Sequence, residues 1–138
     1  MKVVVETPKW SLSKFNFEGG EYMVEYRTPF PCLFNYGFVK HTLGDDGRPR
    51  DALVLGPRLQ QGSEVEVEEV GTVHFMDDGL VDDKAVTSAD GRITFLDKIR
   101  IHLFFTAYML YKIGHIYVHE DRIARCRYHG LSLLPRAR

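Results

Sequence analysis

The chain has 138 residues, of which 44% are hydrophobic and 27% charged, and its formal net charge is −1. This length allows one domain with a core and excludes two, so we expect a single domain over residues 1–138. A nearly neutral chain lacks the basic surplus of a general nucleic-acid binder, so we expect no nucleic-acid partner. Cys32 and Cys126 lie far apart and outside a CxxC spacing, so the sequence suggests neither a disulfide scaffold nor a thiolate zinc site.

The N-terminal residues 1–6 lack the long apolar run of a signal peptide, and no stretch reaches transmembrane length without charges. We therefore expect a cytoplasmic protein that has no membrane partner.

Short runs of β-branched and aromatic residues, separated by Gly, Pro and Asp clusters, predict successive strands. They span residues 2–6, 21–27, 33–40, 52–55, 64–68 and 70–75. Alternation over 64–68 predicts a strand with one buried face, and Glu69 and Gly71 predict a bulge.

A helix is predicted after the strands, because apolar residues recur at helical spacing over residues 96–113. Gly114 is a natural helix stop, residues 115–119 read as a late strand or loop, and 135–138 as a frayed tail. The order predicts an α+β, mainly β fold: a small closed antiparallel (OB-like) β-barrel with one main C-terminal helix packed on it.

Two acidic segments, residues 45–51 and 77–84, lie where strands end. Hard divalent cations such as Mg²⁺ prefer several oxygen ligands, and Asp46, Asp51, Asp77 and Asp82 could supply them. Neither segment has the Gly and Glu positions of an EF-hand loop. The competing interpretation is that each segment is a polar turn.

The order of several motifs resembles that of family I soluble inorganic pyrophosphatases, the magnesium-dependent enzymes that hydrolyse pyrophosphate to phosphate. The resemblance covers roughly residues 3 to 118. Its motifs are Glu6-Thr7-Pro8, Lys14-Phe15-Asn16, Asn35-Tyr36-Gly37-Phe38, Asp46-Gly47-Arg48-Pro49-Arg50-Asp51, Asp77 through Asp82 to Lys84, and Tyr111-Lys112.

The resemblance implies a role for each matching residue. The metal ligands would be Asp46, Asp51, Asp77 and Asp82, and Tyr36 would lie beside the bridging water, so that the catalytic set would be Tyr36, Asp46 and Asp51. The phosphates would be bound by Lys14, Arg27, Lys84, Tyr111 and Lys112. The cofactor would be Mg²⁺ in two or more ions, with Mn²⁺ or Zn²⁺ as substitutes, and we expect a homo-oligomer.

Arg48 stands where the family has the aspartate expected to accept the proton of the nucleophile. A guanidinium is no base, and the loss of a positioned base costs on the order of 10²–10⁴ in rate. Two alternatives therefore stay open: a relative that binds metal and a phosphate-containing ligand with weak or no turnover, and an enzyme for another phosphoanhydride.

Three smaller alternatives also stay open. An insertion of three residues aligns Tyr111 and Lys112 with the family pair, whereas a gapless alignment does not. His115 and His119 have the spacing of a helical zinc pair. An oligonucleotide-binding barrel would use aromatic residues and the arginines near the C-terminus, although the net charge argues against it.

Overall fold

The computed structural model describes residues 1–43 and 47–135. Its elements in chain order are β1 (Lys2–Thr7), β2 (Ser13–Glu18), β3 (Glu21–Arg27), β4 (Asn35–Val39), β5 (Asp51–Val54), β6 (Glu64–Glu66), β7 (Glu68–Asp77), β8 (Leu80–Val81), β9 (Lys84–Ser88), α1 (Phe95–Glu120) and β10 (Arg127–Leu133). The fold is therefore mainly β with one long helix near the C-terminus, as the sequence predicted. No helix in these ranges is long and apolar enough to cross a membrane.

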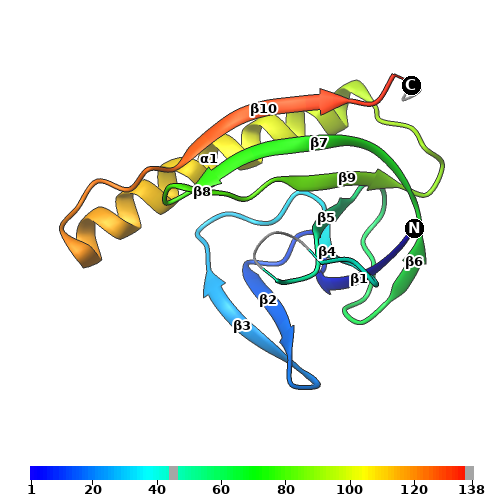
Figure 1. Ribbon diagram of the computed structural model, residues 1–138, viewed down its shortest axis with the longest axis horizontal. Coiled ribbons are helices and arrows are strands. Elements are labelled where there is room, and N and C mark those ends of the chain that lie inside the picture. Colours follow the sequence, from blue (N-terminus) through cyan, green and yellow to red (C-terminus); the bar gives the residue numbers. More distant parts are fainter. Residues whose placement is uncertain (44–46, 136–138) are drawn as a thin grey trace.

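One sheet has the strand order β10-β7-β9-β5-β4-β1-β6, with β8 paired to β7, and β2 with β3 forms a separate hairpin. The sheet curls strongly, and the hairpin projects away from it (Figure 1). The prediction of an antiparallel sheet was wrong for one pair, because β5 and β9 are parallel. A closed barrel is not confirmed, since in the described ranges the ladder has two ends, β10 and β6.

Both faces of β5 and β9 are buried, which explains the apolar run over residues 52–55 and the apolar pair Ala85 and Val86. Leu53 and Val86 pack with α1 residues such as Phe105 in one cluster. The alternate residues Ala52 and Ala85 pack in a second cluster inside the curl of the sheet. One acidic segment ends at Asp51, where β5 begins, and the other ends at Lys84, where β9 begins. The two buried strands therefore bring the ends of both segments to the same part of the sheet.

Gly37 lies where β1 and β4 approach each other closely in this part of the sheet. A Cβ atom added at Gly37 would lie only 1.9 Å from the carbonyl oxygen of Val4. Only glycine fits at this position, and the approach sets the position of the neighbouring Tyr36 on β4.

The helix is longer than predicted, because it continues through Gly114 to Glu120. Its N-terminus is a capping box between Thr94 and Asp97, and it ends at Asp121, which adopts φ 51°. Glycine inside a helix costs about 1 kcal/mol, whereas burial of Ile116, which is 6% exposed, contributes about 1.5–3 kcal/mol. Burial of the last turns thus outweighs the stop signal, and the strand predicted at 115–119 was wrong.

The sequence prediction found six strand regions and missed others. The regions 2–6, 21–27, 33–40, 52–55, 64–68 and 70–75 all contain strands, and the register of β7 against β9 shifts between Glu69 and Gly71, as the predicted bulge requires. The missed strands are β2, β8, β9 and β10. Of the predicted tail, residues 136–138 lie outside the described ranges.

Candidate active site

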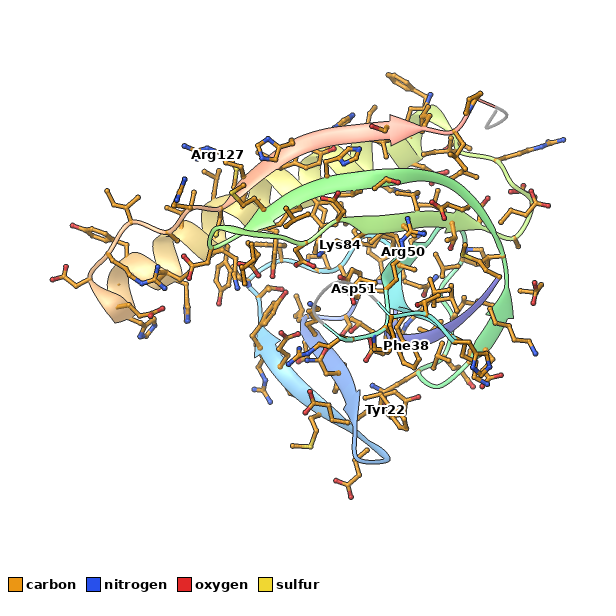
Figure 2. The ribbon with its side chains drawn as sticks, in the orientation of Figure 1. Tyr22, Phe38, Arg50, Asp51, Lys84 and Arg127 are labelled. Carbon is orange, nitrogen blue, oxygen red and sulfur yellow. The ribbon has the colours of Figure 1, made fainter. Side chains whose placement is uncertain are left out.

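Three strand ends meet at one edge of the sheet and bring the acidic segments together. The parallel register pairs Ala52 with Ala85, so Asp51 at the start of β5 lies beside Lys84 at the start of β9. The antiparallel register pairs Val73 with Lys84, which places the end of β7 at the same edge. Asp51 and Lys84 lie near each other between the sheet and the β2–β3 hairpin (Figure 2).

Lys84 is at the centre of this edge and is only 3% exposed. Its Nζ lies 2.7 Å from a carboxylate oxygen of Asp82 and 3.8 Å from one of Asp51, and it donates to the Asp82 carbonyl at 2.9 Å. A buried ammonium is costly without partners, so the two carboxylates account for its position.

Asp77 lies at the end of β7 and is approached from the helix. The Nζ of Lys112 is 3.3 Å from its Oδ1, and the thiol of Cys126 lies 3.8 Å from the same oxygen. The structure therefore brings Lys112 to the acidic edge of the sheet, and its role as a phosphate ligand stays a prediction.

The β2–β3 hairpin contributes a second ammonium. Lys14 Nζ forms an ion pair with Glu25 at 3.2 Å and lies 4.9 Å from the centroid of the Tyr36 ring. Burial lowers the pKa of Lys14, but neighbouring groups, among them Tyr108, Glu25 and Asp51, raise it above its ordinary value. Lys14 is therefore a cation beside the carboxylates of the sheet edge.

Two buried polar groups at the sheet edge, the Asp51 carboxylate and the Tyr36 hydroxyl, would be stabilised by a bound ligand. Burial raises the pKa of Asp51, an effect that Lys84 and then Lys14 partly oppose. The Tyr36 hydroxyl is buried and lacks a well-formed hydrogen bond among the described residues, and its interaction with the Asp51 carboxylate also opposes the rise in the pKa of Asp51. A buried polar atom of this kind normally binds water or a ligand, so a hydrated cation fits here.

The predicted metal ligands are therefore only partly placed. Asp51, Asp77 and Asp82 lie at the sheet edge, and their carboxylate oxygens suit a hard divalent cation. Asp45 and Asp46 lie outside the described residues. In the described ranges no three His, Cys, Asp or Glu side chains converge on one point. The same finding leaves His115 and His119 without a third ligand, although their rings lie 4.3 Å apart on the helix.

Tyr111 and Arg27 make contacts elsewhere. The Tyr111 hydroxyl donates to the backbone carbonyl of Arg27 at 3.1 Å, and its ring packs against Phe30 and His115. The guanidinium of Arg27 is exposed and forms no ion pair with another described residue. The described contacts do not join these two residues to the group around Lys84.

Sequence reasoning missed two residues that line or neighbour the site. Tyr108 lines a pocket together with Lys14, Tyr36 and Lys84, and it lies one turn before Lys112 on α1. The helical spacing of Tyr108 and Lys112 could have revealed this pair. Glu6 was noticed only as part of a motif, yet burial raises its pKa to about 7, while a hydrogen bond from the Phe17 amide opposes the rise.

Residues 3–121 match the family model described as inorganic pyrophosphatase. Together with carboxylates and ammonium groups at one sheet edge, this match defines the chain as a hydrolase of phosphoanhydrides. The chain belongs to the inorganic pyrophosphatase family, and by that membership it is an inorganic diphosphatase that hydrolyses pyrophosphate.

Individual relatives agree with this family. The chain is 32% identical over 129 residues to an inorganic pyrophosphatase of Agrobacterium fabrum, covering 86% of this chain and 71% of the relative. It is 34% identical over 124 residues to one of Streptomyces coelicolor, covering 77% of this chain and 75% of the relative. A further match, in Corynebacterium efficiens, covers 60% of the relative, so the chain spans part of the length of these proteins.

A solved structure of the Helicobacter pylori inorganic pyrophosphatase has the same fold. It superposes with a TM-score of 0.77 at 26% identity, and the match covers 96% of this chain and 84% of that one. The mixed, curled sheet with one long helix is therefore shared with that solved structure.

Proposed function

We propose that the sheet edge around Lys84 is the active site for magnesium-dependent hydrolysis of pyrophosphate, within one unit spanning residues 1–138. The observation that carries this proposal is the position of Lys84 Nζ, 2.7 Å from Asp82 and 3.8 Å from Asp51. An ammonium set among carboxylates where three strands end can contact a phosphate whose other oxygens face a metal site.

Asp51, Asp77 and Asp82 would hold Mg²⁺ ions, and Asp46 is the fourth proposed ligand. The ions would neutralise charge on the phosphates and acidify the attacking water. The partly buried position of Asp51 makes it the ligand whose charge most needs compensation by a cation.

The phosphate ligands on the same edge are lysines that stand beside these carboxylates. Lys112 is 3.3 Å from Asp77, and Lys14 lies over the Tyr36 ring. These ammonium groups orient the pyrophosphate and offset charge that develops on the leaving phosphate. Tyr36 donates its buried hydroxyl to a ligand oxygen, and Tyr108 rather than Tyr111 is the tyrosine on the pocket wall.

Arg48 affects the rate of hydrolysis, because it replaces the aspartate expected to accept the proton of the nucleophile. Its side chain is exposed on the connection between β4 and β5. A guanidinium accepts no proton, so proton removal from the nucleophile depends on the other groups of the site. A slow pyrophosphatase, or one that acts on another phosphoanhydride, follows from this replacement.

The test is phosphate release from pyrophosphate, and from nucleoside and longer phosphoanhydrides, with Mg²⁺, Mn²⁺ or Zn²⁺. Asp51→Asn should remove activity because one of the proposed metal ligands is lost, while the exposed-loop control Asp90→Asn should retain it. Full activity in Asp51→Asn would contradict the assigned site. Arg48→Asp should raise the rate, and no gain would mean that Arg48 belongs to a different substrate preference.

We also propose that the chain forms a homo-oligomer through α1. Leu96, Leu103, Leu110 and Tyr117 share one face of the helix and are 53%, 61%, 60% and 58% exposed. Between residues 101 and 119 the helix has one Asp, Glu, Lys or Arg, namely Lys112, which faces Asp77. A second copy of this face is a matching apolar partner. Light scattering should show a lower mass for Leu103→Glu than for Leu12→Glu, and equal masses would contradict this interface.

A further inference from the structure

The tip of the β7–β8 hairpin carries Asp77, and contacts with another segment of the chain hold this exposed turn in place. Met76 pairs with Val81 and Asp77 with Leu80, which leaves Asp78 and Gly79 as a two-residue loop. Both have positive φ, 52° and 86°, as the tight turn of a hairpin requires. By itself such a turn holds two strands together, but it does not fix the hairpin against the rest of the molecule.

The fixing contacts come from the segment that follows α1. Arg122 donates from both guanidinium nitrogens to the Asp78 carboxylate, at 2.8 and 2.7 Å. The Gly79 amide donates to the Arg125 carbonyl at 3.0 Å, and the thiol of Cys126 reaches Asp77 at 3.8 Å. Figure 1 shows the hairpin tip beside the chain that leads from α1 to β10.

This segment is itself anchored, so it can serve as a support. Ala124 and Cys126 are buried in a small cluster with Ile116, and the Asp121 amide donates to the Tyr117 carbonyl at 3.0 Å. The support exists only because α1 continues through Gly114, which brings Ile116 and the residues after it to the hairpin. The last two turns of the helix thus connect to the acidic edge of the sheet.

We propose that Arg122 is a positioning residue, which holds the β7–β8 hairpin so that Asp77 faces the metal and phosphate site. This inference rests on the proposed function, in which Asp77 is a metal ligand. A bidentate guanidinium–carboxylate pair fixes both distance and orientation, which a single lysine contact does not. Arg122 is exposed, so it acts through Asp78 and does not touch the substrate.

Two effects of removing Arg122 have opposite signs, which makes the proposal testable. Loss of one positive charge near the carboxylates strengthens cation binding through the electrostatic field. Loss of the Arg122–Asp78 ion pair weakens cation binding, because the hairpin then holds Asp77 less firmly. Arg125 supplies a matched control: it lies in the same segment, carries the same charge, and contacts the hairpin through its backbone carbonyl.

The experiment is calorimetric titration of the full chain with Mg²⁺ and Mn²⁺. Arg122→Ala should weaken binding roughly three- to tenfold, which lies between the effect of an exposed ion pair and that of an outer-shell metal partner. Arg125→Ala should leave binding unchanged or slightly tighter, and Arg122→Lys should restore part of the loss. Equal effects of the two alanine variants, or tighter binding in both, would overturn the proposal.

A second measurement does not depend on metal or on catalysis. Hydrogen exchange at the Gly79 amide should be faster in Arg122→Ala than in Arg125→Ala, with unchanged exchange in the core strand β9. Unchanged exchange at Gly79 would also overturn the proposal. If the wild-type chain released no phosphate from any phosphoanhydride, the proposed function would fail. The exchange result would still show whether the Arg122–Asp78 ion pair holds the hairpin in place.

Discussion

The two sides of the site are built differently. The carboxylate side belongs to the main sheet, where β9 is buried along its whole length and Lys84 is 3% exposed. The Lys14 side belongs to the β2–β3 hairpin, a separate two-stranded sheet with Met23 at 54% and Val24 at 48% exposed. In Figure 1 this hairpin stands apart from the layer formed by β7, β9 and α1.

Side-chain contacts attach the hairpin to the rest of the molecule, and Tyr26 on β3 packs against the main core and against the ring of Tyr108. The Phe15 amide donates to the Thr7 hydroxyl at 2.9 Å, and the Phe17 amide donates to Glu6 at 2.7 Å. Sheet register therefore fixes the carboxylate side, whereas side-chain contacts position the Lys14 side. The difference implies that metal affinity and pyrophosphate affinity respond to different substitutions.

Asp82→Asn should have the largest effect, because it removes a metal ligand and the closest partner of the buried Lys84 ammonium. Turnover should fall by on the order of 10²–10⁴, and the Mg²⁺ dependence should move to higher concentration. The neighbouring Asp83 faces His74 instead, at 3.3 Å, so Asp83→Asn is the matched control in steady-state assays over a Mg²⁺ series. Equal losses in both variants would contradict the separate roles of these two carboxylates.

Lys14→Gln should have an intermediate effect, confined to the binding of pyrophosphate. The KM for pyrophosphate should rise about 10- to 100-fold, the value of one charge-assisted hydrogen bond, while Mg²⁺ affinity measured by calorimetry changes little. Lys14→Arg should recover part of the loss. If Mg²⁺ affinity fell as much as pyrophosphate affinity, the two sides of the site would not be separable.

Glu6→Gln should have the smallest effect, visible as a pH dependence of stability. Because burial raises the pKa of Glu6 from 4.5 to about 7, the folded chain binds this proton more tightly than the unfolded chain. Its stabilising contribution is full below pH 4.5 and is lost as the pH rises through 7. The Tm of Glu6→Gln should match wild type near pH 4.5 and exceed it at pH 8, in buffer with a chelator. The same gain in Glu18→Gln, on an exposed residue, would argue against Glu6 as its source.

The sequence predicted those parts of the site that depend on spacing along one strand or turn. The interval from Asp77 through Asp82 to Lys84 spans a single hairpin and the start of β9, so its geometry follows from the local sequence. The parallel pairing of β5 with β9 was not predicted, because it joins segments more than thirty residues apart and leaves no local signal.

The helix and its tyrosines were predicted less well for a related reason. Gly114 is a local stop signal, and only the tertiary burial of Ile116 shows that the helix continues. The choice between Tyr108 and Tyr111 likewise depends on which helix face packs on the sheet. Tyr108 is 5% exposed and lines the pocket, whereas Tyr111 contacts the backbone of Arg27.

Val67 is the single residue between β6, which pairs with β1 at one end of the sheet, and β7, which pairs with β9 and β10 near the other. One stretch of backbone therefore spans the sheet and ends at Asp77. Because side chains alternate along a strand, one residue inserted at this joint would exchange the inner and outer faces of β7 relative to β6. The joint at Val67 thus sets which residues of β6 and β7 share a face, while the pairing of β7 with β9 and β10 holds Asp77 at the acidic edge.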